Sequence, residues 1–106
     1  MPNTAYKSAQ SVALTASLST TPVIHFGPFR TGRILNRSGG AVTITVYECE
    51  EAQGTYVKCD DVGTAGALSA IDNNESLALP TALEGCNYLK FVASSGTPTV
   101  VLAMKD

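Results

Sequence analysis

The sequence has little charge, no tryptophan and a single histidine. Charged residues make up 15% of the 106 residues, where about a quarter is typical of soluble domains, and the formal net charge is −2. The 7 basic residues are scattered, so the chain lacks the footprint of a nucleic-acid-binding protein. No apolar run approaches the roughly 18 residues that cross a bilayer, and the N-terminal MPNTAYKSAQ has no apolar signal-peptide core. Neither nucleic acid nor a membrane is therefore expected as a partner.

Motifs that position catalytic groups or phosphates are also missing. The chain has no GxGxxG or GxxxxGK[ST] phosphate loop and no GxSxG nucleophile turn. His25 lies in the apolar run VIHF, which favours a packed or half-exposed strand histidine over a base oriented by an acid. We therefore expect that the protein is not an enzyme and needs no cofactor.

No metal site is predicted from the spacing of the polar residues. There is no CxxC pair, so a zinc site would have to combine scattered cysteines with His25. Five carboxylates gather near the end of one expected hairpin without the DxDxDG spacing of a calcium loop. We interpret them as solvated surface groups, with a bound cation as the alternative; they are Glu48, Glu50, Glu51, Asp60 and Asp61.

The three cysteines are predicted to be reduced thiols. Cys49, Cys59 and Cys86 are odd in number, so one chain cannot pair them all. In the hairpin formed by residues 41–49 and 55–59, placing Val46 opposite Val57 turns Cys59 inward and Cys49 outward. Two residues on opposite faces of a ladder cannot form a disulfide. The alternative register, with Cys49 opposite Cys59, would extend the strand through two aspartates. We therefore favour the register with Val46 opposite Val57.

What the sequence does contain is alternation with a period of two, which predicts an all-β chain. We expect an antiparallel β-sandwich of about eight strands, with jelly-roll or immunoglobulin-like topology. Hairpins are predicted between 41–49 and 55–59, across the turn at 72–75, and between 87–94 and 99–104, and one helical turn within 79–86. Further strands are expected at 11–19, 23–26 and 33–36.

One domain is expected, with its core formed by the apolar positions of these strands. Residues 11–106 would form the sandwich, and residues 1–10, which lack alternation, would form an extended arm anchored by Tyr6 on another subunit or on a partner protein. The predicted interior residues are Val42, Ile44, Val46, Val57, Leu89 and Phe91.

Arginines and tyrosines are the candidate contacts for a protein partner, because both are enriched at binding hot spots. Arg30, Arg33 and Arg37 follow one another closely, and Tyr47 and Tyr56 are expected on the outer surface of the sheet. The alternative is that the arginines are solvated residues protecting a strand edge and that the tyrosines are simply good strand formers.

Two long strings resemble a known group of proteins. NRSGGAVTITVYECEEAQGTYV and GCNYLKFVASSGTPTVVLAMK are similar to runs in the small β-sandwich structural proteins of tailed bacteriophage virions. The resemblance covers most of residues 6–105 and rests on turns and alternating strands, so no functional residue can be carried over position by position.

The resemblance implies a non-enzymatic virion protein, either one that decorates (cements) the phage head or a minor virion protein. Its partners would be the major capsid protein or other virion proteins, and it would form homo-oligomers within the virion after assembly in the bacterial cytoplasm. The alternative is a carbohydrate- or receptor-binding β-sandwich module of a phage tail or a cell surface, which the absence of tryptophan makes less attractive.

Overall fold

Strands form where β-branched and apolar residues alternate, and turns form where glycine, asparagine and serine interrupt them. The computed structural model describes residues 8–63 and 66–105. In those ranges it contains nine strands and one short 3₁₀ helix: β1 (Ser8–Ala13), β2 (Ile24–His25), β3 (Thr31–Asn36), β4 (Val42–Cys49), β5 (Val57–Lys58), β6 (Ala67–Ile71), β7 (Glu75–Ala78), η1 (Thr81–Leu83), β8 (Tyr88–Ala93) and β9 (Thr99–Lys105).

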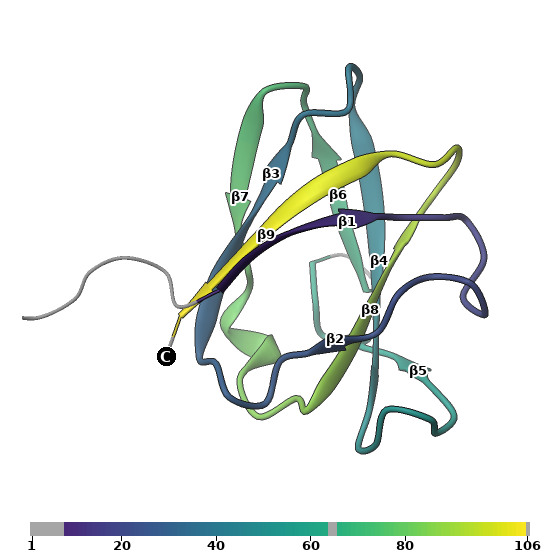
Figure 1. Ribbon diagram of the computed structural model, residues 1–106, viewed down its shortest axis with the longest axis vertical. Helices are drawn as coiled ribbons and strands as arrows, with labels where there is room; N and C mark the ends of the chain where they lie inside the picture. The colour runs from purple at the N-terminus through teal and green to yellow at the C-terminus, as the bar shows by residue number, and fades with distance from the viewer. Residues whose placement is uncertain (1–7, 64–65, 106) are drawn as a thin grey trace, which may run out of the picture.

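The strands form two antiparallel sheets that face each other across the core (Figure 1). Sheet A has the order β1-β9-β3-β7. Sheet B has the order β2-β8-β4, and both β5 and β6 pair with the remaining side of β4 at different heights. The all-β sandwich predicted from the alternation is confirmed.

The connections between strands decide between the two expected topologies. Outside the run β4–β5–β6, every strand is followed by a strand of the other sheet. This order, with β5 as an addition, is that of a jelly roll and not of an immunoglobulin fold, in which neighbouring strands often pair within one sheet.

Two of the predicted hairpins are therefore wrong. β8 pairs with β4 and β2, whereas β9 pairs with β1 and β3, so the SGTP turn connects the two sheets. β6 likewise pairs with β4 while β7 pairs with β3, so the turn at 72–75 also crosses the sandwich. A hairpin and a crossing connection need the same turn residues and the same alternation, which is why the sequence pattern did not separate them.

The predicted interior is confirmed except at Val57. The other five predicted residues are buried, but the Val57 side chain is 59% exposed. β4 and β5 pair two residues away from the predicted register, with Glu48 opposite Val57, and the Cys59 amide donates to the Val46 carbonyl at 2.9 Å. A shift of two keeps every residue on its face, so Cys59 points inward as predicted, and Val57 moves to the end of the ladder where no layer covers it.

The first strand begins and ends earlier than expected. β1 starts at Ser8, so residues 8–10, predicted to be part of the arm, belong to the sheet. Beyond Ala13 the chain turns away because serine and threonine side chains bond to nearby backbone, as when Thr21 Oγ1 donates to the Ser17 carbonyl at 2.8 Å. Residues 1–7, with the predicted anchor Tyr6, lie outside the described residues.

A buried asparagine holds one of the crossings between the sheets. Asn36 is fully buried, and its Nδ2 donates to the carbonyls of Gly40 at 2.8 Å and Ile71 at 2.7 Å. Its Oδ1 accepts from the backbone amide of Ser38 at 3.0 Å and from the Ser38 hydroxyl at 2.7 Å. The turn at 38–40 that these bonds hold has Gly39 at a φ of 98°, which suits glycine. The helical turn predicted within 79–86 is present as η1.

Candidate functional site

The outer surface of sheet A is a broad area of short, mostly uncharged side chains. The register places a row with Thr31 opposite the half-buried Lys105 at one end of this surface, and the three rows beyond it contain one charged residue, an arginine. We call this surface the neutral face; it consists of Ala9, Ser11, Ala13, Arg33, Leu35, Ser76, Ala78, Thr99, Val101 and Ala103.

The one arginine of the neutral face lies along the sheet. Arg33 Nε and Nη2 donate to the Ser76 hydroxyl at 3.3 and 3.2 Å, which directs the guanidinium toward the edge strand β7. The two outer strands of the sheet, β1 and β7, each have a strand on one side only among the described residues. The neutral face is therefore a surface of low relief with an open strand edge on either side, a form that suits contact with another protein surface.

The other two candidate arginines lie at the two ends of β3. Arg30 precedes the strand, and its side chain is 78% exposed and forms an ion pair with Glu84 at 3.6 Å. Arg37 follows the strand, is exposed and lines a hollow with Leu35 and Ser76, so it borders the neutral face. Arg33 lies within the neutral face, Arg37 at its border and Arg30 at the opposite end of the strand.

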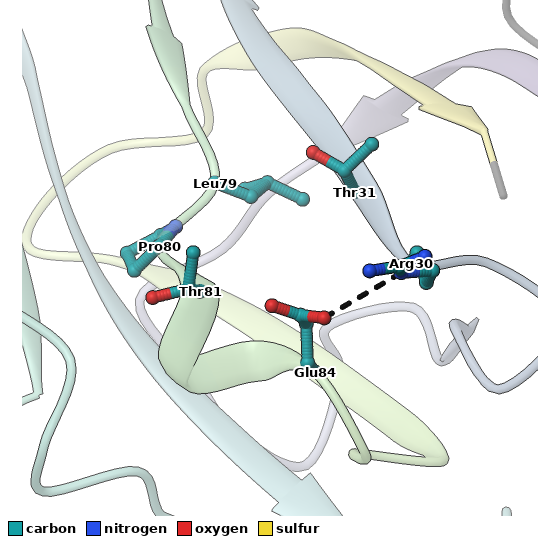
Figure 2. Close-up of a pocket in the computed structure, with 6 residues that line it drawn as sticks. All are labelled: Arg30, Thr31, Leu79, Pro80, Thr81 and Glu84. Atoms are coloured by element: carbon teal, nitrogen blue, oxygen red, sulfur yellow. Dashed lines mark ion pairs between the residues drawn. The ribbon is translucent and has the colours of Figure 1, made fainter.

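Arg30 and Glu84 belong to a hollow between the start of β3 and η1 (Figure 2). Its volume is about 210 Å³, below the roughly 300 Å³ at which pockets for ordinary organic ligands begin. Figure 2 shows the two charged side chains directed toward each other, so its charges are already paired. The remaining lining comes from Thr31, Leu79, Pro80 and Thr81. This hollow does not provide a convincing small-molecule site.

The candidate tyrosines lie on the opposite side of the molecule, on the outer face of sheet B. Tyr47 lies opposite Lys90 in the β4–β8 ladder. The Lys90 Nζ lies 4.9 Å from the centre of the Tyr56 ring. Tyr88 stacks on His25 with ring centres 4.6 Å apart. We call these five residues the aromatic cluster. The structure thus separates Tyr47 and Tyr56 from Arg33 by the full thickness of the sandwich.

The Tyr56 hydroxyl is held within this cluster. It donates to the Ala52 carbonyl at 2.9 Å, and burial, with smaller effects of Cys49 and Tyr88, raises the pKa of this phenol. One side of the Tyr56 ring is taken by the Lys90 ammonium, and one side of Tyr88 is taken by His25. One face of each of these two rings is therefore already occupied by another member of the cluster.

The structure brings together a group of residues that the sequence analysis did not connect. Glu48, Cys59 and Cys86 place one potential metal-ligand atom each within 4.8 Å of one another. His25, considered earlier as a partner for the cysteines, is not among them and stacks on Tyr88 on the outer face.

The third cysteine is separate from this group. Cys49 leaves the outer face of β4 as predicted, but it is buried and not exposed, because the turn containing Gly54 covers its sulfur. Its thiol donates to Glu50 Oε1 at 3.3 Å. None of the three cysteines forms a disulfide in the structure.

Comparisons with family models, with curated proteins and with solved structures find no match. Within the described ranges there is also no helix of the length and apolar character needed to cross a membrane.

Proposed function

We propose that this chain is a structural, protein-binding β-sandwich that attaches to the head of a tailed bacteriophage as a decoration protein. The observation that carries the proposal is the neutral face, a surface of short uncharged side chains that crosses all the strands of sheet A. The resemblance of the chain's two long strings to virion structural proteins supplies the identity of the partner.

The chemistry of the neutral face favours protein contact over small-molecule binding. Alanine, serine, threonine and valine lose little rotamer freedom when a partner covers them, so less of the gross binding energy is lost to ordering. Charged residues are depleted at the centres of protein interfaces because their desolvation is costly. Arg33 is the one charged residue within the three rows of the neutral face, and Lys105 and Arg37 lie at its borders. A standard interface of about 800 Å² per partner would cover about a seventh of this protein's accessible surface of 5756 Å².

The open edge of β1 offers a second contact beside the face. An extended segment of a neighbouring subunit can pair with such an edge through backbone hydrogen bonds alone. Residues 1–7 lead directly into this strand, and we include them in the proposed contact, which would join copies of the chain into an oligomer on the head.

The experiment that tests this function is the composition of purified particles. Mass spectrometry of virions separated into heads and tails should find the chain in the head fraction, in a fixed ratio to the major capsid protein. Its absence from purified particles, or its recovery only with tails, would contradict a role on the head.

A second candidate is a carbohydrate- or receptor-binding module, and the aromatic cluster is the observation that favours it. Tyrosine rings can stack on sugars, and Tyr47, Tyr56 and Tyr88 lie near one another on sheet B. Binding of the chain to host envelope polysaccharide, lost in Tyr88→Ala and kept in Val101→Glu, would favour this function over head decoration.

A further inference from the structure

Three segments that are distant in the sequence bring acidic and thiol groups together at one end of sheet B. Glu48 lies near the end of β4, Cys59 directly follows β5, and Cys86 lies just before β8. The Cys59 thiol donates to Glu48 Oε2 at 3.5 Å, and the Cys86 thiol donates to Glu48 Oε1 at 3.4 Å. Both cysteines are buried, with exposed fractions of 2% and 8%.

The separations fit the edges of a tetrahedral metal site. With zinc–sulfur bonds of about 2.3 Å and zinc–oxygen bonds of about 2.0 Å, tetrahedral angles place sulfur and oxygen about 3.5 Å apart and two sulfurs about 3.8 Å apart. The observed sulfur–oxygen distances of 3.4 and 3.5 Å are of this size, but Cys86 is measured to Glu48 Oε1 and Cys59 to Glu48 Oε2. The carboxylate would therefore bind the ion through both oxygens, or rotate to present one of them. The two sulfurs lie within 4.8 Å of each other, so a small side-chain adjustment would bring them to the sulfur–sulfur distance of about 3.8 Å.

The charge around the group favours a cation. Among the described residues, no lysine, arginine or histidine forms an ion pair with Glu48, and the nearby Lys58 pairs with Asp60 at 3.8 Å. Within the described residues, the Glu48 carboxylate is therefore held by two thiol donors rather than by a basic side chain.

Solvent can reach the Glu48 carboxylate from one side. A groove of about 270 Å³ is lined by Glu48, Cys49, Glu50, Thr55, Val57, Gly85 and Asn87, the last two on either side of the buried Cys86. The position left open by three protein ligands can therefore be filled by water, as in zinc sites with three protein ligands.

We propose that Glu48, Cys59 and Cys86 bind one Zn²⁺ ion, with a water molecule from the groove as the fourth ligand. Two sulfur ligands select zinc over magnesium and calcium, which prefer oxygen. On binding, each thiol releases its proton to solvent and its sulfur forms a bond to zinc, with no change of oxidation state. The ion would join β4, the turn after β5 and the segment before β8. This site is independent of the neutral face, so its failure would leave the proposed function standing.

The test uses the whole chain, reduced, freed of metal with a chelator and titrated with Zn²⁺ against a competing chromophoric chelator. Wild type should bind one equivalent and melt at a higher temperature with zinc. Co²⁺ in place of zinc should give sulfur-to-cobalt charge-transfer absorption. Cys86→Ser and Cys59→Ser should lose more affinity than the roughly 10–100-fold typical of outer-shell partners, and the cobalt band of each should weaken.

Cys49→Ser is the matched control, because Cys49 is equally buried and lines the same groove but is not one of the three proposed ligands. It should bind zinc like wild type. Glu48→Gln, which keeps the shape of the side chain, covers the case in which the serine variants do not fold, and it should also weaken binding. The proposal is overturned if wild type shows no one-to-one binding, or if Cys49→Ser loses as much affinity as Cys86→Ser. A Cys59–Cys86 disulfide recovered from the zinc-loaded protein would overturn it as well.

Discussion

Ile44 and Val57 were both predicted to be interior residues, and the structure assigns them opposite environments. Ile44 is 0% exposed and lies between Ala93 of β8 and Leu68 of β6, whereas Val57 is 59% exposed. Ile44→Ala removes three buried carbons, which costs about 2.4 kcal/mol of transfer free energy at about 0.8 kcal/mol each. The cavity that remains should bring the loss to about 2.5–4 kcal/mol.

Urea unfolding of Ile44→Ala, with Val57→Ala as the control, measures this difference. Val57→Ala should change the free energy of unfolding by less than about 0.5 kcal/mol, because the side chain is already in water. The melting temperature of Ile44→Ala should fall by at least about 10 °C, since each kcal/mol shifts a domain of this size by about 4–8 °C. Equal losses in the two variants, or a loss below about 1 kcal/mol for Ile44→Ala, would refute the assignment of faces.

Four further outcomes are expected. Asn36→Ala should destabilise the fold by about 2–4 kcal/mol, because it removes the donor to the buried Ile71 carbonyl, a second donor to Gly40, and the acceptor of the Ser38 amide and hydroxyl. Asn73→Ala, which loses one exposed bond to Gly39, should cost under about 1 kcal/mol by the same melts. Alkylation of denatured protein without reductant should modify all three cysteines, and a single modified cysteine in mass spectra would show a disulfide. In metal-free protein, burial raises the pKa of Cys86 to about 11 in the fold, whereas thiols of unfolded chains ionise near pH 8.5. Melts at increasing pH should therefore show stability falling between these two values, because the unfolded chain loses the proton first. A flat profile would contradict the burial of the thiols. Deleting residues 1–7 leaves the described pairs of β1, from Ser8 to Ala13, intact, so the melting temperature should hold while binding to heads weakens, and unchanged binding would remove these residues from the contact.

The elements of this fold could be predicted where one residue type determines the local structure. Val42, Ile44 and Val46 alternate cleanly and define β4, and Gly39 supplies the positive φ of the turn before it. The helical turn at η1 follows Pro80 and ends before Gly85, which has a φ of 91°. Each of these depends on neighbours in the sequence, which is the range over which patterns are informative.

The pairing of the strands could not be predicted in the same way. The turn after β8 has the composition of a hairpin, yet it carries the chain to the other sheet. Nothing within the two strands states which partner each will have, because both choices bury the same faces. The two-residue shift between β4 and β5 is equally invisible, since it preserves the inward side of every residue and changes only which one lies at the uncovered end.

The group formed by Glu48, Cys59 and Cys86 was missed for the same reason. Cys59 and Cys86 are 11 and 38 residues from Glu48, and no short sequence motif links the three. The register of β4 and β5 brings Cys59 beside Glu48, and the pairing of β4 with β8 brings the segment before β8 to the same place. Cys59 follows β5 and Cys86 precedes β8, and both of these strands pair with β4. The sequence would have indicated the group only if this pairing had been known.

The most direct test of the central claim places one charge on each of the two outer surfaces of the sandwich. Val101 and Thr45 are both half-buried β-branched residues in the middle of a central strand, the first on the neutral face and the second on the outer face of sheet B. Val101→Glu, Thr45→Glu and wild type are added to heads assembled by a phage that lacks this gene, and the bound fraction is measured by co-sedimentation after melts confirm that all three are folded. We predict that Thr45→Glu binds like wild type and that Val101→Glu binds at least about tenfold more weakly, since an unpaired charge at an interface costs more than 1.4 kcal/mol. Binding of Val101→Glu at the strength of wild type, or an equal loss in Thr45→Glu, would contradict docking through the neutral face.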